Sequence, residues 1–165
     1  MRGRILILSL APLLGMFALF DAAGLRMNTS ASLPVGLYIV SPNGGFVEFC
    51  PDDRGLSAQR HYRARGVCSD GAAPLLKPVV AAAGDAVELS ARGISVNGVL
   101  LPNTAPLSED SKGRPLGAWP FGRYCVAPGA VWVASSHHPR SFDSRYFGPI
   151  STAAIRHRLR PFLTL

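Results

Sequence analysis

The 165-residue chain has little charge and almost no lysine. Charged residues make up only 16% of it, and just two of its 17 basic residues are lysines, Lys77 and Lys112. It has no convincing amphipathic helix, no internal repeat and no low-complexity tract, which argues against repeat and disordered architectures. With a hydrophobic content of 48%, a chain of this length is typical of one compact domain.

Cysteine is also scarce, with three residues whose spacings match no zinc site, so we expect neither a metal nor a cofactor. Cys50 and Cys68 flank a loop rich in Asp, Arg and Gly that has little apolar material to hold it. A disulfide between them would stabilise the fold by about 3 kcal/mol and would require an oxidising compartment. Cys125 lies in an apolar run and is expected to be a small buried hydrophobe. Pairing with Cys125 instead remains open, because connectivity cannot be derived from sequence.

A formal net charge of +7 suggests an anionic partner, but no nucleic-acid motif accompanies it. The arginines are scattered in three groups: Arg2 and Arg4; Arg60, Arg63 and Arg65; and Arg156, Arg158 and Arg160. We therefore predict no nucleic-acid binding and interpret these arginines as a solvated basic surface. For an extracytoplasmic domain, anionic lipid headgroups are the nearer partner.

The only long apolar run follows Arg2 and Arg4 and covers residues 5–20 without a charge. It exceeds the usual signal-peptide core of about 7 to 15 residues. Continuing to Leu25 extends it to the roughly 20 residues that a membrane span needs. We expect a cytoplasmic basic tip and anchor over residues 1–25 and an extracytoplasmic domain over residues 26–165. The alternative is a cleaved signal peptide, because Ala22, Ala23 and Gly24 offer small residues.

Beyond this segment the sequence consists of short β-branched or aromatic runs separated by turn residues, which predicts an all-β domain. Asn97-Gly98 favours a hairpin between residues 94–96 and 99–101. Residues 102–122 are rich in proline and glycine and are expected to form a long exposed loop. A short helix is expected to begin near Ser151. The remaining strands are expected at residues 36–40, 46–49, 79–83, 86–89 and 131–134.

Histidine does not provide a convincing catalytic group in this chain. His137 and His138 are adjacent, so in extended backbone their side chains point to opposite faces, and a polar turn is the expected role. Lys77 is more informative, because it lies in the apolar stretch LLKPVV (75–80), where desolvation would lower its pKa. On periodicity alone, the simpler interpretation is a lysine that extends to solvent from a strand edge.

Three ordered segments decide between these interpretations: NTSASLPVGLY (28–38), LLKPVVAAAGD (75–85) and SFDSRYFGPI (141–150). Together they resemble the nucleophile, lysine and third motifs of type I signal peptidases of the serine-lysine class. The likeness is greatest to the TraF-type conjugative-transfer peptidases and covers about residues 28–150. It implies a signal-peptidase-like catalytic β-domain preceded by one transmembrane helix.

The resemblance implies Ser32 as the nucleophile and Lys77 as the general base. Ser141 corresponds to the serine that orients the lysine amine, and Asp143 and Arg145 correspond to charged residues that support the site. No metal or cofactor is implied.

Ser30 matches a position whose hydroxyl assists the Ser32 backbone amide in holding the oxyanion, although a simple turn hydroxyl is an equal alternative.

Two departures from the pattern of the general signal peptidases stand out. Pro78 follows the lysine where the general enzymes have a basic residue, which leaves Arg145 as the candidate ion partner of Asp143. Pro34 is one residue closer to Ser32 than in the general enzymes, which favours the conjugative subfamily.

The implied function is a membrane-anchored serine endopeptidase on the periplasmic face of a bacterial cytoplasmic membrane. Its expected partners are membrane lipid, other proteins of a conjugation apparatus and an exported, pilin-like precursor; in some relatives the product is circular. Three alternatives remain. One is a catalytically silent assembly factor with the same anchor, and another is a general type I signal peptidase. The third, a self-cleaving repressor, disagrees with the apolar leader and the paired cysteines.

Overall fold

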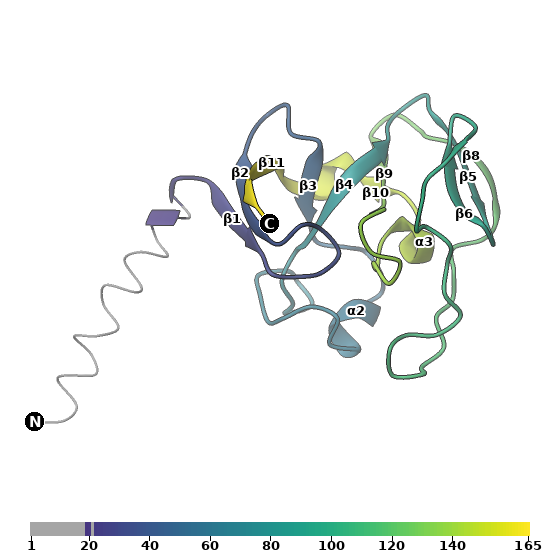
Figure 1. Cartoon of the computed structure of the whole chain (residues 1–165), viewed down its shortest axis with the longest axis horizontal. Coiled ribbons are helices and arrows are strands. Elements are labelled where there is room, and N and C mark those ends of the chain that lie inside the picture. Colours follow the sequence, from purple (N-terminus) through teal and green to yellow (C-terminus); the bar gives the residue numbers. More distant parts are fainter. Residues whose placement is uncertain (1–18, 21) are drawn as a thin grey trace, which may run out of the picture.

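The computed structural model describes residues 19–20 and 22–165, which form two antiparallel β-sheets and a few short helices (Figure 1). This confirms the all-β expectation. Among the described residues no helix is long and apolar enough to cross a membrane. The expected anchor falls almost wholly on residues 1–18 and 21 and so lies outside the described part.

The larger sheet has seven strands in the order β1-β2-β11-β3-β4-β9-β10. Their bounds are β1 Leu25–Asn28, β2 Gly36–Val40, β11 Ile155–Thr164, β3 Phe46–Phe49, β4 Leu75–Ala81, β9 Ala130–Val133 and β10 Ile150–Ser151. The smaller sheet has the order β7-β6-β5-β8, with bounds β7 Val99–Leu100, β6 Gly93–Val96, β5 Ala86–Ser90 and β8 Gly122–Cys125. The helical elements are α2 Leu56–Gln59, α3 Ser144–Phe147 and the 3-10 turn η1 Thr152–Ala154.

Strand β9 connects two of the three hydrophobic clusters of the described residues, because successive side chains on a strand point to opposite faces. Val131 and Val133 pack with Val47 and Phe49 of β3 on one face. Trp132, on the other face, packs in a second cluster with side chains of β5 and β6, including Val87, Leu89 and Ile94. Both clusters therefore pack against β9 and its neighbour β4, the strand that carries Lys77 of the site described below.

Several expected strands are confirmed. β2 and β3 have the expected bounds, and the Asn97-Gly98 hairpin forms with positive φ at both turn residues, 50° and 84°. The expectation for β4 was wrong at its start: the strand begins at Leu75 instead of residue 79. Lys77 is therefore inside a strand, paired with Val47.

Two other expectations need correction. Near Ser151 there is only a single 3-10 turn, capped by the Ser151 hydroxyl, and no α-helix. Residues 102–121 do form a loop, but it is not exposed throughout, because Thr104 and Asp110 are buried. The Thr104 hydroxyl accepts a hydrogen bond from Ile94 N in β6, which attaches the loop to the smaller sheet.

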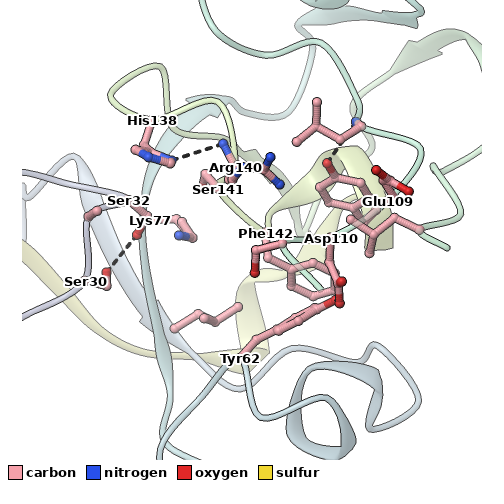
Figure 2. Close-up of a pocket in the computed structure, with 16 residues that line it drawn as sticks. Ser30, Ser32, Tyr62, Lys77, Glu109, Asp110, His138, Arg140, Ser141 and Phe142 are labelled. Atoms are coloured by element: carbon pink, nitrogen blue, oxygen red, sulfur yellow. Dashed lines mark hydrogen bonds between the residues drawn. The ribbon is translucent and has the colours of Figure 1, made fainter. Parts of the chain in front are cut away.

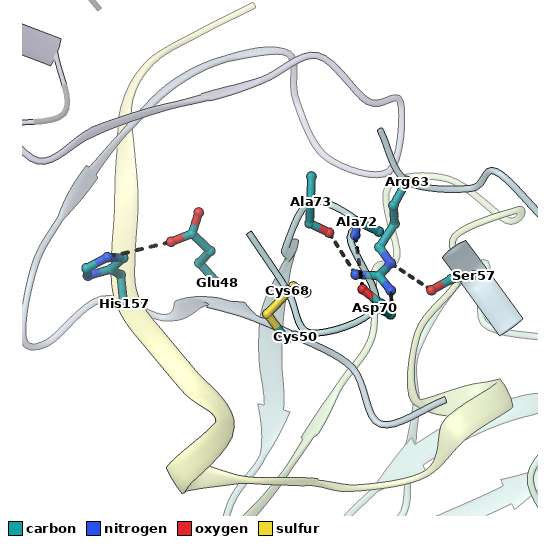
Figure 3. The surroundings of a disulfide bond; sticks show 9 residues. All are labelled: Glu48, Cys50, Ser57, Arg63, Cys68, Asp70, Ala72, Ala73 and His157. Atoms are coloured by element: carbon teal, nitrogen blue, oxygen red, sulfur yellow. Dashed lines mark hydrogen bonds and ion pairs between the residues drawn. A yellow bond between two sulfur atoms is a disulfide. The ribbon is translucent and has the colours of Figure 1, made fainter. Parts of the chain in front are cut away.

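The disulfide between Cys50 and Cys68 is present and closes a loop that contains α2 (Figure 3). Arg63 in this loop is buried and makes an ion pair with Asp70, so it is not part of a solvated basic surface as expected. Its guanidinium also donates to Ser57 Oγ and to the carbonyl oxygen of Ala73. Cys125 is exposed, so its expected burial was wrong. It alternates in β8 with Tyr124, whose ring packs on Trp132 instead.

Candidate active site

The turn that carries Ser32 is organised by the buried side chain of Asn28, the last residue of β1. Asn28 Nδ2 donates to the carbonyl oxygens of Ser30 at 3.0 Å and of Leu33 and Pro34 at 3.2 Å. Because three carbonyl oxygens surround one end of the side-chain amide, that end is the nitrogen. The other end, which faces the Ser30 N–H and hydroxyl, is the oxygen. It accepts from Ser30 N at 3.2 Å and from Ser30 Oγ at 2.8 Å.

This arrangement determines the direction of the hydrogen bond between the two serines. Ser30 Oγ lies 2.9 Å from Ser32 Oγ, and a hydroxyl has one hydrogen to donate. The Ser30 hydrogen is committed to Asn28 Oδ1, which can only accept. Ser32 therefore donates to Ser30 in this state. For Ser30 to stabilise an oxyanion, its hydroxyl would first have to turn away from Asn28.

Lys77 lies in the interior of the larger sheet, because β4 has β3 on one side and β9 on the other. Only 3% of the residue is exposed, which excludes a side chain extending to solvent from a strand edge. Burial lowers the pKa of the Lys77 amine from 10.5 to about 8, with Asp143 opposing this shift and Arg145 adding to it. No hydrogen bond joins the amine to Ser32 within the described residues.

A fully buried ion pair lies behind the lysine. Arg145 Nε is 2.8 Å from Asp143 Oδ1, and both side chains are 0% exposed. Asp143 also caps α3 by accepting from Arg145 N, and it accepts from Ser135 N at 3.1 Å. The Ser135 hydroxyl in turn donates to the carbonyl oxygen of Ser32. The ion pair is thereby connected to the nucleophile turn through one residue.

Ser141 begins the same segment and is held by its backbone, because its carbonyl oxygen accepts from Arg145 at 2.7 Å. Its side-chain hydroxyl is buried and has no hydrogen-bond partner in the described structure. A buried hydroxyl without a partner is costly unless a ligand or a neighbouring group uses it.

A cavity of about 300 Å³ brings these residues together (Figure 2). Ser30, Ser32, Lys77 and Ser141 all line it, whereas Asp143 and Arg145 support it from behind. Its remaining walls are mainly apolar or aromatic and include Leu75, Leu107, Leu116, Phe142 and Tyr146. A second hollow of about 240 Å³, bounded by β1, β3 and the disulfide loop, shares Ser30, Ser32 and Lys77 with the first. The serine and lysine therefore stand where two hollows meet, as a peptide passing through both would require.

The wall farthest from Ser32 is built by two loops that contact each other. Tyr62, from the disulfide loop, donates to the Asp110 carboxylate at 2.5 Å, and Arg114 Nε contacts the same carboxylate at 2.7 Å. Burial alone would raise the pKa of Asp110, but hydrogen bonds from Tyr62, Arg114 and Lys112 together hold it below its usual range. Arg60 also donates to the carbonyl oxygen of Pro115 at 2.7 Å.

Sequence reasoning missed the roles of Asn28, Ser135, Tyr62 and Asp110. Asn28 is the first residue of the segment NTSASLPVGLY (28–38), and a polar residue two positions before a serine is typical of a turn-capping role. Nothing in the sequence points to Ser135, Tyr62 or Asp110, because their contacts join residues 48 to 103 positions apart.

A family model described as "Signal peptidase, peptidase S26" matches residues 4–163. The chain belongs to this signal peptidase family. The plasmid transfer protein TraF of Escherichia coli is 41% identical over 150 residues, covering 87% of this chain and 84% of the relative. A probable conjugal transfer protein TraF of Sinorhizobium fredii is 36% identical over 171 residues, covering 93% and 87%.

Among solved structures, a signal peptidase I from Enterococcus faecalis has 22% identity and a TM-score of 0.38, covering 72% of this chain and 96% of that one. The family resemblance inferred from the three motifs, including its TraF-type character, is confirmed by the family model and the TraF relatives. For this S26 family member, no group of three or more His, Cys, Asp or Glu residues within the described chain is arranged to hold a metal ion.

Proposed function

We propose that this S26 signal peptidase is a serine endopeptidase with Ser32 as nucleophile and Lys77 as general base. The observation that carries the proposal is that the buried Lys77 amine lines the same cavity as Ser32. Its pKa is lowered to about 8. A lysine with an unperturbed pKa of about 10.4 is almost entirely protonated at neutral pH and cannot accept a proton. Burial reduces that obstacle, because a pKa of about 8 leaves about a tenth of the amine neutral at pH 7.

In the first step, the Lys77 amine takes the Ser32 hydroxyl proton while Ser32 Oγ attacks the carbonyl carbon of the scissile bond. The Ser32 backbone N–H, assisted by a rotated Ser30 hydroxyl, stabilises the oxyanion. The Lys77 ammonium then gives its proton to the leaving amine, which leaves an acyl-enzyme on Ser32. In the second step, Lys77 deprotonates the water, or the substrate amine, that attacks this ester. The Lys77 ammonium then returns the proton to Ser32 Oγ as the acyl–oxygen bond breaks and the product leaves.

Ser141 and the buried ion pair act as positioning groups in this mechanism. The unpartnered Ser141 hydroxyl is available to accept from the Lys77 ammonium and so to orient it. Asp143 favours the protonated amine and thus assists the proton-bearing intermediates, whereas Arg145 opposes this effect. Asp143 and Ser135 together hold the Ser32 turn against β9.

The names of the TraF relatives support a role in plasmid conjugation, and the signal peptidase family supports an exported precursor as substrate. We propose a pilin-like subunit as the specific substrate. We further propose that residues 1–25 anchor the enzyme in the bacterial cytoplasmic membrane and that residues 26–165 act on its periplasmic face. The disulfide is consistent with an oxidising compartment.

The test is precursor processing in cells that lack any other copy of the enzyme. Ser32→Ala and Lys77→Ala should each abolish cleavage, and the double variant should be no worse, because the two residues act as a unit. Lys112→Ala, which removes the only other lysine, is the matched control and should process normally. Normal processing by either dyad variant would refute the assignment. A silent assembly factor would support pilus formation equally well with Ser32→Ala.

A further inference from the structure

Arg140 is a cation held at the rim of the catalytic cavity by a rigid turn. Its backbone N donates to His138 Nδ1 at 3.1 Å. The residues on both sides of it are fixed by buried Arg145, which donates to the carbonyl oxygens of Pro139 at 2.9 Å and Ser141 at 2.7 Å. The position of Arg140 is thus determined by the same guanidinium that supports the catalytic segment.

The Arg140 side chain itself is exposed and, among residues 19–20 and 22–165, has no hydrogen bond and no ion pair. Two carboxylates line the cavity, on the opposite wall. Asp110 is already engaged by Tyr62 and Arg114. Glu109 also lines the cavity but makes no ion pair with Arg140. Figure 2 shows Glu109 at the end of the cavity away from Ser30 and Ser32.

The catalytic end of the cavity therefore carries unneutralised positive charge. Lys77 and Arg140 both line it, and the Asp143 carboxylate behind it is paired with Arg145. A guanidinium has a planar set of donors that matches a carboxylate in two parallel hydrogen bonds. A free guanidinium that faces a cavity on a fixed turn is preorganised for such a group.

We infer that Arg140 is a specificity-determining residue that binds a substrate carboxylate close to the scissile bond. The inference rests on the proposed peptidase function and adds to it a preference for substrate charge. The carboxylate is either an Asp or Glu side chain or the C-terminal carboxylate of a short leaving segment. Both sources present the same chemistry to Arg140, and the experiment separates them.

The probes are two synthetic peptide libraries randomised over Ala, Leu, Ser, Glu and Gln, one with a free C-terminal carboxylate and one with a C-terminal amide. The full-length protein in detergent is incubated with each library, and cleavage products are identified by mass spectrometry. In parallel, the uncleaving Ser32→Ala protein captures peptides, so that binding is measured independently of catalysis. Each measurement is repeated with Arg140→Gln and Arg140→Glu. Arg92→Gln is the control, because Arg92 is an exposed arginine outside the cavity.

For a side-chain carboxylate, we expect Glu to be preferred over Gln at one position near the cut by about tenfold or more. For a terminal carboxylate, the acid library should be preferred over the amide library by a similar factor. Arg140→Gln should remove the preference while cleavage of neutral peptides continues, and Arg140→Glu should reverse it. Arg92→Gln should leave it intact.

The inference is overturned if Arg140→Gln leaves both the preference for Glu over Gln and the preference for the acid over the amide library unchanged. It is also overturned if Arg92→Gln loses these preferences to the same extent. Failure of the peptidase assignment gives a different result. In that case no library is cut by any variant, yet the captured peptides still show whether Arg140 selects a carboxylate.

Discussion

At the scale of single residues, Asn28 determines which atoms around Ser32 are donors and which are acceptors. Its amide nitrogen is used by three carbonyl oxygens, so its oxygen must face Ser30 and take the Ser30 hydrogen. Ser32 in turn must donate to Ser30. This hydrogen bond directs the Ser32 proton away from Lys77, so the proposed proton transfer would require the Ser32 hydroxyl to rotate when substrate binds.

Asn28→Ala should therefore lower kcat by at least about tenfold, with a smaller change in KM, because the turn that orients both hydroxyls loses its centre. The free energy of unfolding should fall by about 1–3 kcal/mol, since the replacement leaves buried polar groups without partners. Steady-state kinetics and urea denaturation measure the two effects. Asn43→Ala, at an exposed turn, is the control and should change neither. An unaltered kcat for Asn28→Ala would contradict the orienting role.

The pKa of Lys77 predicts the pH dependence of activity. In the proposed mechanism the base is the neutral amine, so with a pKa of about 8 only about a tenth of the molecules would be competent at pH 7. The cleavage rate should rise nearly tenfold per pH unit below pH 8 and level off above it. A pH–rate profile of kcat/KM tests this. A profile that levels off near pH 6.5 would point to a histidine base instead.

The same shift predicts that Lys77 destabilises the fold. Between pH 8 and 10.5 the unfolded chain holds the lysine proton more tightly than the folded chain, so stability rises with pH in that window. Lys77→Met should increase the free energy of unfolding by up to about 3 kcal/mol at pH 7, a gain that fades as pH approaches 10.5. Urea denaturation at pH 7 and pH 10 measures it. A lower stability of Lys77→Met at pH 7 would show that the ammonium is well solvated.

At the scale of elements, the disulfide loop matters because its far side forms a wall of the cavity. Tyr62 and Arg60 in this loop contact Asp110 and Pro115 across the mouth of the site. Inside the loop, the buried Arg63 connects Ser57 and Ala73 (Figure 3). A change at the cysteines is therefore expected to reach the substrate wall.

Replacing both Cys50 and Cys68 by serine should lower the free energy of unfolding by about 3 kcal/mol, because the unfolded chain regains the freedom of the open loop. KM should rise more than kcat falls, since Tyr62 contacts the wall and not the dyad. Cys125→Ser is the matched control and should change neither value, because Cys125 is exposed and unpaired. If kcat and kcat/KM fell by the same factor in the double variant, the loop would support the catalytic step and not substrate binding.

The sequence predicts some elements and not others for identifiable reasons. β2 and β3 are short, strongly β-forming runs with turns on both sides, so local preference and tertiary structure agree. β11 was not predicted, because arginine, histidine and Pro161 in IRHRLRPFLT weaken the strand signal. The proline is accommodated by a register shift between Pro161 and Leu163, and the strand is held between β2 and β3. Such a position depends on partners far along the chain.

The candidate site likewise has features that the sequence predicts and features that it does not. The motifs gave the identities of Ser32, Lys77, Ser141, Asp143 and Arg145, and the structure brings the first three to one cavity with the ion pair behind them. The directions of the hydrogen bonds were not predictable, because they depend on Asn28 facing three carbonyl oxygens. The far wall was not predictable either, because Tyr62 and Asp110 are neighbours only after folding.

At the scale of the whole molecule, the distance between the proposed anchor and the nucleophile turn is set by very few residues. Leu25–Asn28 is strand β1, which pairs with β2 from Leu25 opposite Ile39 onward. Even Gly24 is attached, because its carbonyl oxygen accepts from Val40 N. In the sequence, only three residues separate the apolar run of residues 5–20 from Gly24, where the folded domain begins.

If the apolar run within residues 1–25 anchors the enzyme as proposed, this short connection holds Ser32 at one height above the bilayer. About ten Gly and Ser residues inserted between Ala23 and Gly24 would let the domain move some 16 to 19 Å further on average. The cavity and Lys77 would be unchanged, so cleavage of a soluble peptide should keep its rate. Cleavage of a membrane-embedded precursor should slow, because the tether supplies effective concentration and not transition-state binding. The ratio of the two rates in the native and lengthened enzymes measures this, and an equal ratio would show that the anchor does not position Ser32.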